Sequence, residues 1–375
     1  MCFVVCCIQQ KKMDLFSLFG KPCWAPRIIR IDGEEQVAQM IGCSRSIMHL
    51  QKIMEKFDWK VSIRVNIFIL RFAGLWPKNN IYKYNIYTLY SLVAINVFIN
   101  GHNLFQVANI FFVYKDLEAL TAIIFITFTE ILASFKAFCY VRNMGMLRNL
   151  MSDLQENIFQ PRNERQRILV QRCFDEWKFA YVSYFVPTII TLVLWAAFPI
   201  MDGTFKQYRL PFSAWYPYDT QTSPLYQITY IYQVLGIWFL AITHLNMDSM
   251  ITALMSCVKC QCEILCDNVR NLRNCERGTY SEKLVGCIQH HQKILSFADT
   301  CNKFIDKVVL GQFFNSLMSL ALAMFELTLV RPLSSEFCSF LFFVGSILMQ
   351  VFQFCWFGNE IGLKLHFPSN TLNDK

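Results

Sequence analysis

Few side chains in this sequence are arranged for enzyme or metal chemistry. It contains no nucleophile elbow, zinc-protease helix motif, phosphate-binding loop or dinucleotide-binding glycine pattern. His290 and His291 are adjacent, so they point to different faces of a helix and do not readily share one metal ion. A run of cysteines also lacks the two spaced pairs of a zinc site: Cys257, Cys260, Cys262, Cys266 and Cys275. The sequence therefore predicts no catalytic residue, no cofactor and no metal site.

Two carboxylates stand out because they fall inside long apolar runs. Glu130 lies in the middle of one run, and Glu326 lies near the end of another. An ionisable group in lipid is costly, so such a residue usually faces protein or water and marks a ligand or ion contact. The alternative is a structural role, with Glu130 hydrogen-bonded to Thr127 and Thr129 and Glu326 close to lipid headgroups. We select Glu130 as a candidate ligand contact.

Aromatic residues are dense at one end of the apolar runs, the end that the charges below place outside. Some are expected to belong to the aromatic belts at membrane interfaces. A cluster of aromatics with few polar groups is also typical of a pocket for small apolar ligands, and spacing alone does not separate the two. The candidate ligand-binding residues are Phe125, Phe128, Glu130, Trp195, Tyr226, Tyr230 and Phe340.

The composition indicates what kind of fold must position these residues. The 375 residues are 54% hydrophobic and 17% charged, with 35 phenylalanines and a mean hydropathy of +0.32. Ordinary soluble domains have about 25% charged residues, so this chain has too few charges to cover a soluble exterior. The net charge of +8 does not indicate nucleic-acid binding, because the basic residues lie beside the apolar runs. The sequence predicts an all-α, polytopic membrane protein embedded in the lipid bilayer.

Six apolar segments are long enough to cross a bilayer as helices, which takes about 20 residues each. Their approximate limits are 84–106, 118–141, 179–201, 220–247, 308–330 and 337–357. The third contains two prolines, which neighbouring helices can accommodate. The predicted divisions are a cytoplasmic amino-terminal segment (1–82), a transmembrane domain (83–361) and a tail (362–375).

Lysine and arginine predict the orientation of these spans. They are abundant before the first span and after the second and fourth, whereas the loop after the third carries only Lys206 and Arg209. Basic loops stay in the cytoplasm, so the amino terminus is predicted there and the loop after the third span outside. In that loop Trp215 and Tyr216 are expected to fold over the helices as a lid, since burying a large apolar side chain gains roughly 1.5–3 kcal/mol.

The long segment between the fourth and fifth spans has its own pattern. Apolar residues recur at helical spacing at Ile251, Leu254, Val258, Leu265 and Leu272, and again at Leu284, Ile288, Leu295 and Ile305. We expect both spans to continue into the cytosol as a helical hairpin. Its apolar stripe is expected to pack against neighbouring helices or against another subunit.

Four strings, in this order and spacing, resemble the insect odorant receptor family. They are GLWP at 74–77, LPFSAWYP at 210–217, HHQKIL at 290–295 and FCWFGNE at 354–360. The resemblance covers about residues 54 to 361. It implies a seven-helix receptor subunit with a cytoplasmic amino terminus, in the plasma membrane of olfactory sensory neurons.

The resemblance also implies how such a subunit works. A small volatile odorant would bind between helices in the outer half of the membrane. The subunit would assemble with a shared co-receptor, as a tetramer, into a ligand-gated cation channel. Most subunit contacts would come from the cytoplasmic ends of the helices, where His290, Ile294 and Phe297 are the candidates.

The sequence departs from the family pattern at both ends. After Glu360 the family continues into a seventh, pore-lining helix, whereas residues 362–375 form a short polar tail that contains Pro368. Residues 1–53 match no part of the family pattern. We expect the pore helix to be absent from the chain as written, with weak or no odorant-gated current.

Three other functions remain alternatives. A gustatory receptor of the same superfamily is the nearest, although the LPFSAWYP string favours olfaction. A G-protein-coupled receptor would have its amino terminus outside, and the sequence shows neither D-R-Y after the third span nor N-P-x-x-Y in the last. A secondary transporter would show inverted repeats and matching broken helices, which are not visible in the sequence.

Overall fold

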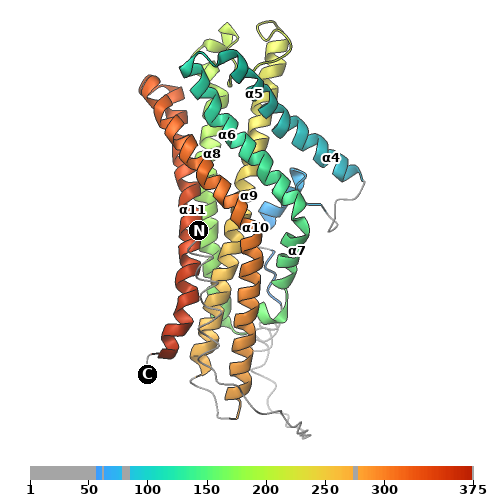
Figure 1. The fold of residues 1–375 in the computed structure, drawn as a ribbon, viewed down its shortest axis with the longest axis vertical. Coiled ribbons are helices and arrows are strands. Elements are labelled where there is room, and N and C mark those ends of the chain that lie inside the picture. Colours follow the sequence, from blue (N-terminus) through green and yellow to red (C-terminus); the bar gives the residue numbers. More distant parts are fainter. Residues whose placement is uncertain (1–55, 61–62, 78–84, 273–277, 374–375) are drawn as a thin grey trace, which may run out of the picture.

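The computed structural model describes residues 56–60, 63–77, 85–272 and 278–373, so the predictions for residues 1–53 and Cys275 lie outside the described residues. Every regular element in this part of the chain is helical, and the longest helices run side by side in one bundle (Figure 1). The elements are α3 (Arg64–Phe72), α4 (Ile86–Ala94), η1 (Ile95–Asn100), α5 (Gly101–Val113), α6 (Leu117–Arg142), α7 (Met144–Asp153), η2 (Asn157–Phe159), α8 (Glu164–Met201), η3 (Thr204–Gln207), α9 (Leu225–Asn271), α10 (Tyr280–Leu329) and α11 (Ser335–Asn373). The predicted all-α, polytopic fold is confirmed.

Five helices are long and apolar enough to cross a membrane. The segments are Ala119–Arg142, Glu164–Met201, Leu225–Asn271, Tyr280–Leu329 and Glu336–Lys364, and they contain the second to sixth predicted spans almost completely. Their outward faces remain apolar; on α10, for example, Leu310, Phe314 and Leu317 are all more than 60% exposed. A continuous apolar exterior of this kind is what lipid tails require.

The first predicted span, 84–106, takes a different form. Helix runs from Ile86 to Val113, but the π-helical turn η1 separates α4 from α5. The three pieces contain 9, 6 and 13 residues and follow one another without a break. Figure 1 shows α4 and α5 running obliquely to the long helices. Apolar periodicity does not reveal a π-turn within such a helix.

The loop 202–224 lies at one end of the bundle, which we call the outer half after the predicted orientation. The opposite end, with α7 and the ends of α9 and α10 that are joined through residues 272–279, is the inner half. The helices α9 and α10 contain 47 and 50 residues, so at about 1.5 Å per residue each is more than twice as long as a bilayer core of about 30 Å. Both helices therefore continue beyond the predicted spans, as the hairpin prediction requires, and their place in the cytosol stays a prediction.

The apolar stripe of this hairpin packs within the chain. Ile251 and Leu254 are completely buried, and Val258 is 2% exposed. They belong to one continuous hydrophobic core that includes residues of α3, α7, α8, α10 and α11. The stripe was predicted to pack against neighbouring helices or against another subunit. The structure shows it packed against the neighbouring helices.

An ion cluster fastens the inner half of α9 to its neighbours. Lys259 Nζ lies 2.6 Å from Glu176 Oε2 on α8 and 3.1 Å from Glu360 Oε2 on α11. Burial alone would lower the pKa of Lys259, but the hydrogen bonds to both carboxylates raise it above its ordinary value. Glu360 belongs to the FCWFGNE string, and α11 continues beyond it to Asn373, through the segment predicted as a tail.

Candidate ligand-binding site

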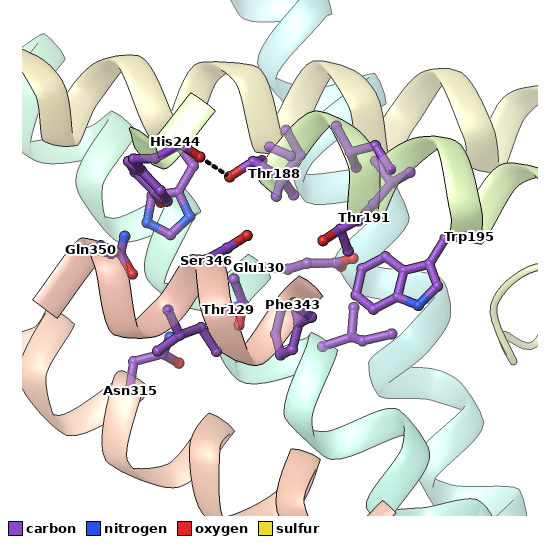
Figure 2. Close-up of a pocket in the computed structure, with 17 residues that line it drawn as sticks. Thr129, Glu130, Thr188, Thr191, Trp195, His244, Asn315, Phe343, Ser346 and Gln350 are labelled. Carbon is purple, nitrogen blue, oxygen red and sulfur yellow. Dashed lines mark hydrogen bonds between the residues drawn. The ribbon is translucent and has the colours of Figure 1, made fainter. Parts of the chain in front are cut away.

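A small cavity lies in the outer half, where five helices meet. Its volume is about 90 Å³, and side chains of α6, α8, α9, α10 and α11 form its wall (Figure 2). The contribution of α8 follows helical spacing, with Tyr184, Thr188, Thr191 and Trp195 on one face. The remaining hydrogen-bonding groups come from Thr129, Glu130, His244, Asn315, Ser346 and Gln350. The site is therefore a small pocket between helices with a mixed polar and aromatic wall.

Glu130, which the sequence analysis selected, reaches this cavity from α6. Its side chain is buried, and its Oε1 lies 2.7 Å from Nδ1 of His102 on α5. Its second oxygen, Oε2, is buried and has no hydrogen-bond partner. In Figure 2 the carboxyl group is directed towards Thr191 and Trp195 of α8. One oxygen of this cavity-lining carboxylate is thus buried without a partner.

The partner of Glu130 differs from the alternative considered from sequence. Thr127 Oγ1 donates to the carbonyl of Ile123 at 2.9 Å, and Thr129 Oγ1 donates to the carbonyl of Phe125 at 3.2 Å. Hydroxyls within a helix commonly bond the carbonyl four residues earlier, which explains why they do not serve the carboxylate. The sequence analysis missed His102, although an imidazole within the first apolar run was a visible signal.

The predicted aromatics divide between the cavity and the structure behind it. Trp195 lines the cavity, and its ring centroid lies 5.3 Å from that of Phe343, which was not predicted. Phe125 and Phe340 pack behind them, with ring centroids 5.6 Å apart. Of the seven predicted residues, Glu130 and Trp195 therefore line the cavity itself.

The other three predicted aromatics lie elsewhere. The hydroxyl of Tyr226 donates to the carbonyl of Arg209 at 2.8 Å, and that of Tyr230 donates to the carbonyl of Ala196 at 2.5 Å. These bonds hold the start of the outer loop and the end of α8. Phe128 is half-buried on α6 and is not part of the cavity wall. Their density in sequence reflects packing at the outer end of the bundle.

A second, larger hollow lies beneath the outer loop, and we call it the vestibule. Its volume is about 340 Å³, and residues 208–214 of the loop cover the helix ends that form its floor. Phe125 and Phe340 contribute to its wall, as does Glu326, whose Oε1 accepts a hydrogen bond from Thr121 at 2.6 Å. Trp195 and Ile126 line both hollows. They form the partition between vestibule and cavity.

The two loop residues predicted to form a lid occupy different environments. Tyr216 is 7% exposed, and Gln233 Nε2 donates to its hydroxyl at 3.2 Å. Burial raises the pKa of Tyr216 well above its ordinary value. Trp215 is 40% exposed and stacks on Phe112 with ring centroids 5.7 Å apart. Of these two residues, Tyr216 is therefore the buried one.

A network of buried polar side chains lies on the inner side of the cavity. Lys136 Nζ lies 2.5 Å from Asp248 Oδ1 and also donates to Gln312. Gln350 Nε2 donates to the other oxygen of Asp248, and His244 Nε2 lies 3.3 Å from Gln312 Oε1. These residues connect α6, α9, α10 and α11. His244 and Gln350 also line the cavity. The cavity wall is therefore connected by hydrogen bonds to all four of these helices.

The residues predicted to contact another subunit are buried inside this chain. His290, Ile294 and Phe297 are 3%, 1% and 3% exposed. His290 Nε2 lies 3.0 Å from Gln261 Oε1, and the Phe297 ring packs against Phe159. Their helical spacing places them on the inward face of the hairpin, so a second subunit does not reach these side chains in this conformation.

The cysteines of the hairpin are free and buried, as far as the structure describes them: Cys257, Cys260, Cys262 and Cys266. Burial raises the pKa of the Cys257 thiol to about 12, which disfavours the thiolate that metals bind. Within the described residues, no group of three histidine, cysteine or acidic side chains is arranged to hold a metal ion.

Similar proteins of known class share this architecture. A family model described as "7tm Odorant receptor" matches residues 116–364. Odorant receptor Or1 of Anopheles gambiae is 23% identical over 338 residues, which covers 82% of this chain and 80% of that protein. Odorant receptor 46a, isoform A, of Drosophila melanogaster is 22% identical over 304 residues, covering 78% of this chain and 77% of that protein.

Solved structures show the same fold. The insect olfactory receptor OR5 from Machilis hrabei, in complex with eugenol, superposes with a TM-score of 0.67 at 18% identity, covering 83% of this chain and 80% of that one. Its structure without that ligand gives the same TM-score, covering 84% and 81%. The resemblance inferred from the four strings is confirmed: this chain belongs to the 7tm odorant receptor family of polytopic membrane proteins.

Proposed function

We propose that the cavity around Glu130 is the site where this odorant receptor subunit binds a small volatile ligand. One observation carries the proposal: five helices enclose a hollow with an aromatic wall and several hydrogen-bonding groups. Small-molecule sites are usually concave, largely apolar and equipped with a few polar groups that orient the ligand. The cavity also adjoins the Lys136–Asp248 network, so a ligand there contacts residues that connect four helices.

We propose that the ligand enters through the vestibule. The partition between vestibule and cavity consists of Trp195 and Ile126, with the Trp195 ring packed edge-on against Phe212 of the outer loop. A rotation of the Trp195 side chain would join the two hollows. The Trp195 side chain is buried among the rings of Phe212 and Phe343, so we expect this gate to open more slowly than an exposed side chain changes rotamer.

We further propose that the subunit functions in the plasma membrane of olfactory sensory neurons, joined to a co-receptor in a tetrameric, ligand-gated cation channel. Membership of the odorant receptor family and the five membrane-length helices support this assignment. OR5 of Machilis hrabei, which shares the fold, was solved in complex with eugenol. A small organic ligand is therefore compatible with this architecture.

The proposed orientation has a direct test. A glycosylation acceptor introduced at the outer loop near Thr204 is expected to be modified, and one introduced near Asn163 is not. Modification near Asn163 alone would reverse the orientation and place the vestibule in the cytoplasm.

The ligand site is tested by filling the cavity. Ala241 lies on the cavity wall, whereas Ala321 is exposed on α10, so Ala241→Phe and Ala321→Phe add the same ring in different places. A ligand that binds the folded state raises the unfolding temperature of the purified protein. We expect a panel of small volatile compounds to stabilise the wild type and Ala321→Phe, and this shift to disappear in Ala241→Phe. An unchanged shift in Ala241→Phe would contradict the proposal.

A further inference from the structure

Glu130 lines the cavity and has one carboxylate oxygen without a hydrogen-bond partner. Its Oε1 is paired with His102, whereas its Oε2 is buried with no hydrogen-bond partner. A buried acceptor without a donor loses the hydrogen bonds that water supplied and gains nothing in return. A ligand that brings an N–H or O–H group to this oxygen would restore the missing bond. The cavity therefore favours hydrogen-bond donors.

The charge of the site follows from the partners of Glu130. His102 Nε2 is also buried without a partner, so a doubly protonated ring would bury a second N–H with no acceptor. His102 Nδ1 contacts both Glu130 Oε1 at 2.7 Å and Gln106 Nε2 at 3.4 Å, so it is shared between two neighbours. The other titratable groups on the cavity wall are Tyr184 and His244, and the nearby Lys136 is bound to Asp248. Among the described residues, no lysine or arginine pairs with Glu130, and His102 is its one ion-pair partner.

Aromatic faces complete the arrangement. Trp195 and Phe343 line the cavity with ring centroids 5.3 Å apart, and the Glu130 carboxyl is directed towards Trp195 and Thr191 (Figure 2). Aromatic faces attract cations, and indole does so most strongly. A carboxylate beside aromatic rings suits an ammonium group attached to a short hydrocarbon. The cavity volume of about 90 Å³ restricts the ligand to a small molecule.

We infer that the ligand of this receptor is a small volatile amine, bound as its ammonium ion with an N–H group donating to Glu130 Oε2. Its hydrocarbon part lies against Trp195 and Phe343. The inference rests on the proposed function, since it names the class of ligand for the same cavity. It also gives Glu130 a role other than packing, because the carboxylate selects the charge of the ligand.

The test compares ligands of equal shape on matched variants. Affinities of a short-chain primary amine and of the alcohol with the same carbon skeleton are measured on the purified full chain in lipid nanodiscs. Glu130→Gln keeps the shape of the side chain and removes its charge. Glu326→Gln is the control, because Glu326 is a second buried carboxylate, in the vestibule wall and bonded to Thr121.

A hydrogen bond to a charged group is worth about 1.5–3 kcal/mol, which corresponds to about tenfold or more in affinity. We expect the wild type and Glu326→Gln to bind the amine at least about tenfold more tightly than the alcohol. Glu130→Gln is expected to lose that preference and to keep its affinity for the alcohol within about threefold. Equal amine affinity in Glu130→Gln and the wild type would overturn the inference.

Two further outcomes separate the inference from the proposed function. If neutral volatile compounds bind in the cavity and amines do not, the inference fails while the proposed function stands. If Ala241→Phe prevents the binding of no volatile compound, both the inference and the proposed function fail. Should Glu130→Gln not fold, Glu130→Asp keeps the charge on a shorter side chain. It is expected to bind the amine more weakly than the wild type but still in preference to the alcohol, and equal binding of the two would overturn the inference.

Discussion

The inner and outer halves of the bundle bury their side chains in different ways. In the inner half one continuous hydrophobic core extends from Trp59 through α7 to the ends of α9 and α10. In the outer half the buried apolar residues form smaller clusters, and the cavity and the vestibule lie among them. Close packing makes an interior stiff, whereas hollows leave room for side chains to move. The comparison indicates an inner half with one continuous core, beside a groove between α8 and α11, and an outer half whose smaller clusters leave two hollows.

Buried charges show the same contrast. In the network below the cavity, Lys136 and both oxygens of Asp248 have partners on neighbouring helices. In the cavity itself, Glu130 has one partner and one oxygen without any. A fully satisfied network fixes the arrangement of helices, and a partly satisfied one leaves a place for a ligand.

The largest predicted effect concerns the Lys136–Asp248 pair. Asp248→Ala leaves a buried lysine without its counter-charge, and breaking such a pair costs about 3–5 kcal/mol. We expect a large fall in the unfolding temperature or a loss of expression. The double variant Lys136→Met with Asp248→Leu removes both charges and is expected to recover most of the loss.

The control for this pair is Asp175→Ala, which removes an exposed carboxylate paired with Lys178. Exposed pairs contribute less than about 1 kcal/mol, so this variant should remain close to the wild type. Equal stability of Asp248→Ala and Asp175→Ala would show that the network does not hold the helices together.

A smaller effect is predicted for pH in the inner half. Burial lowers the pKa of His290 to about 4, below its ordinary value of 6.5. The unfolded chain therefore binds this proton more readily, and stability falls as the pH decreases from 6.5 towards 4. Between pH 7 and pH 5 the loss amounts to about 2 kcal/mol. We expect His290→Phe, which cannot take up the proton, to lose clearly less stability than the wild type over this range, as measured by denaturation at each pH.

The smallest predicted effect concerns the outer loop. Tyr216→Phe removes the hydroxyl that Gln233 bonds, which should cost about 0.5–1.5 kcal/mol. Trp215→Phe changes a side chain that is 40% exposed and should change stability by less than about 0.5 kcal/mol. Thermal unfolding of the two variants ranks them. A larger loss for Trp215→Phe would mean that Trp215, not Tyr216, anchors the loop.

Local sequence patterns predicted the helices and part of the site. The apolar runs gave five of the long helices, and the cost of a carboxylate in lipid singled out Glu130, which lines the cavity. The pairing of His102 with Glu130 and of Lys136 with Asp248 could not be predicted in the same way. The residues of these pairs are 28 and 112 positions apart, and only the packing of the helices brings them together.

Span boundaries explain another omission. The fourth predicted span ends at residue 247, so Asp248 falls just beyond it and is not among the predicted candidates. In the structure α9 continues without a break, and Asp248 is 3% exposed. The density of aromatic residues also misled, because Tyr226 and Tyr230 hold the outer loop and the end of α8 through backbone carbonyls. Spacing does not distinguish a packing aromatic from a ligand contact.

The most direct test of the ligand site is photolabelling of the purified chain with a small alkyl diazirine, followed by peptide mass spectrometry. The cavity account predicts adducts on α8 between Thr191 and Trp195 and on α11 near Phe343, lost in Ala241→Phe and retained in Ala321→Phe. Adducts confined to the groove between α8 and α11 that Phe179 and Trp356 line, and unaffected by Ala241→Phe, would contradict it.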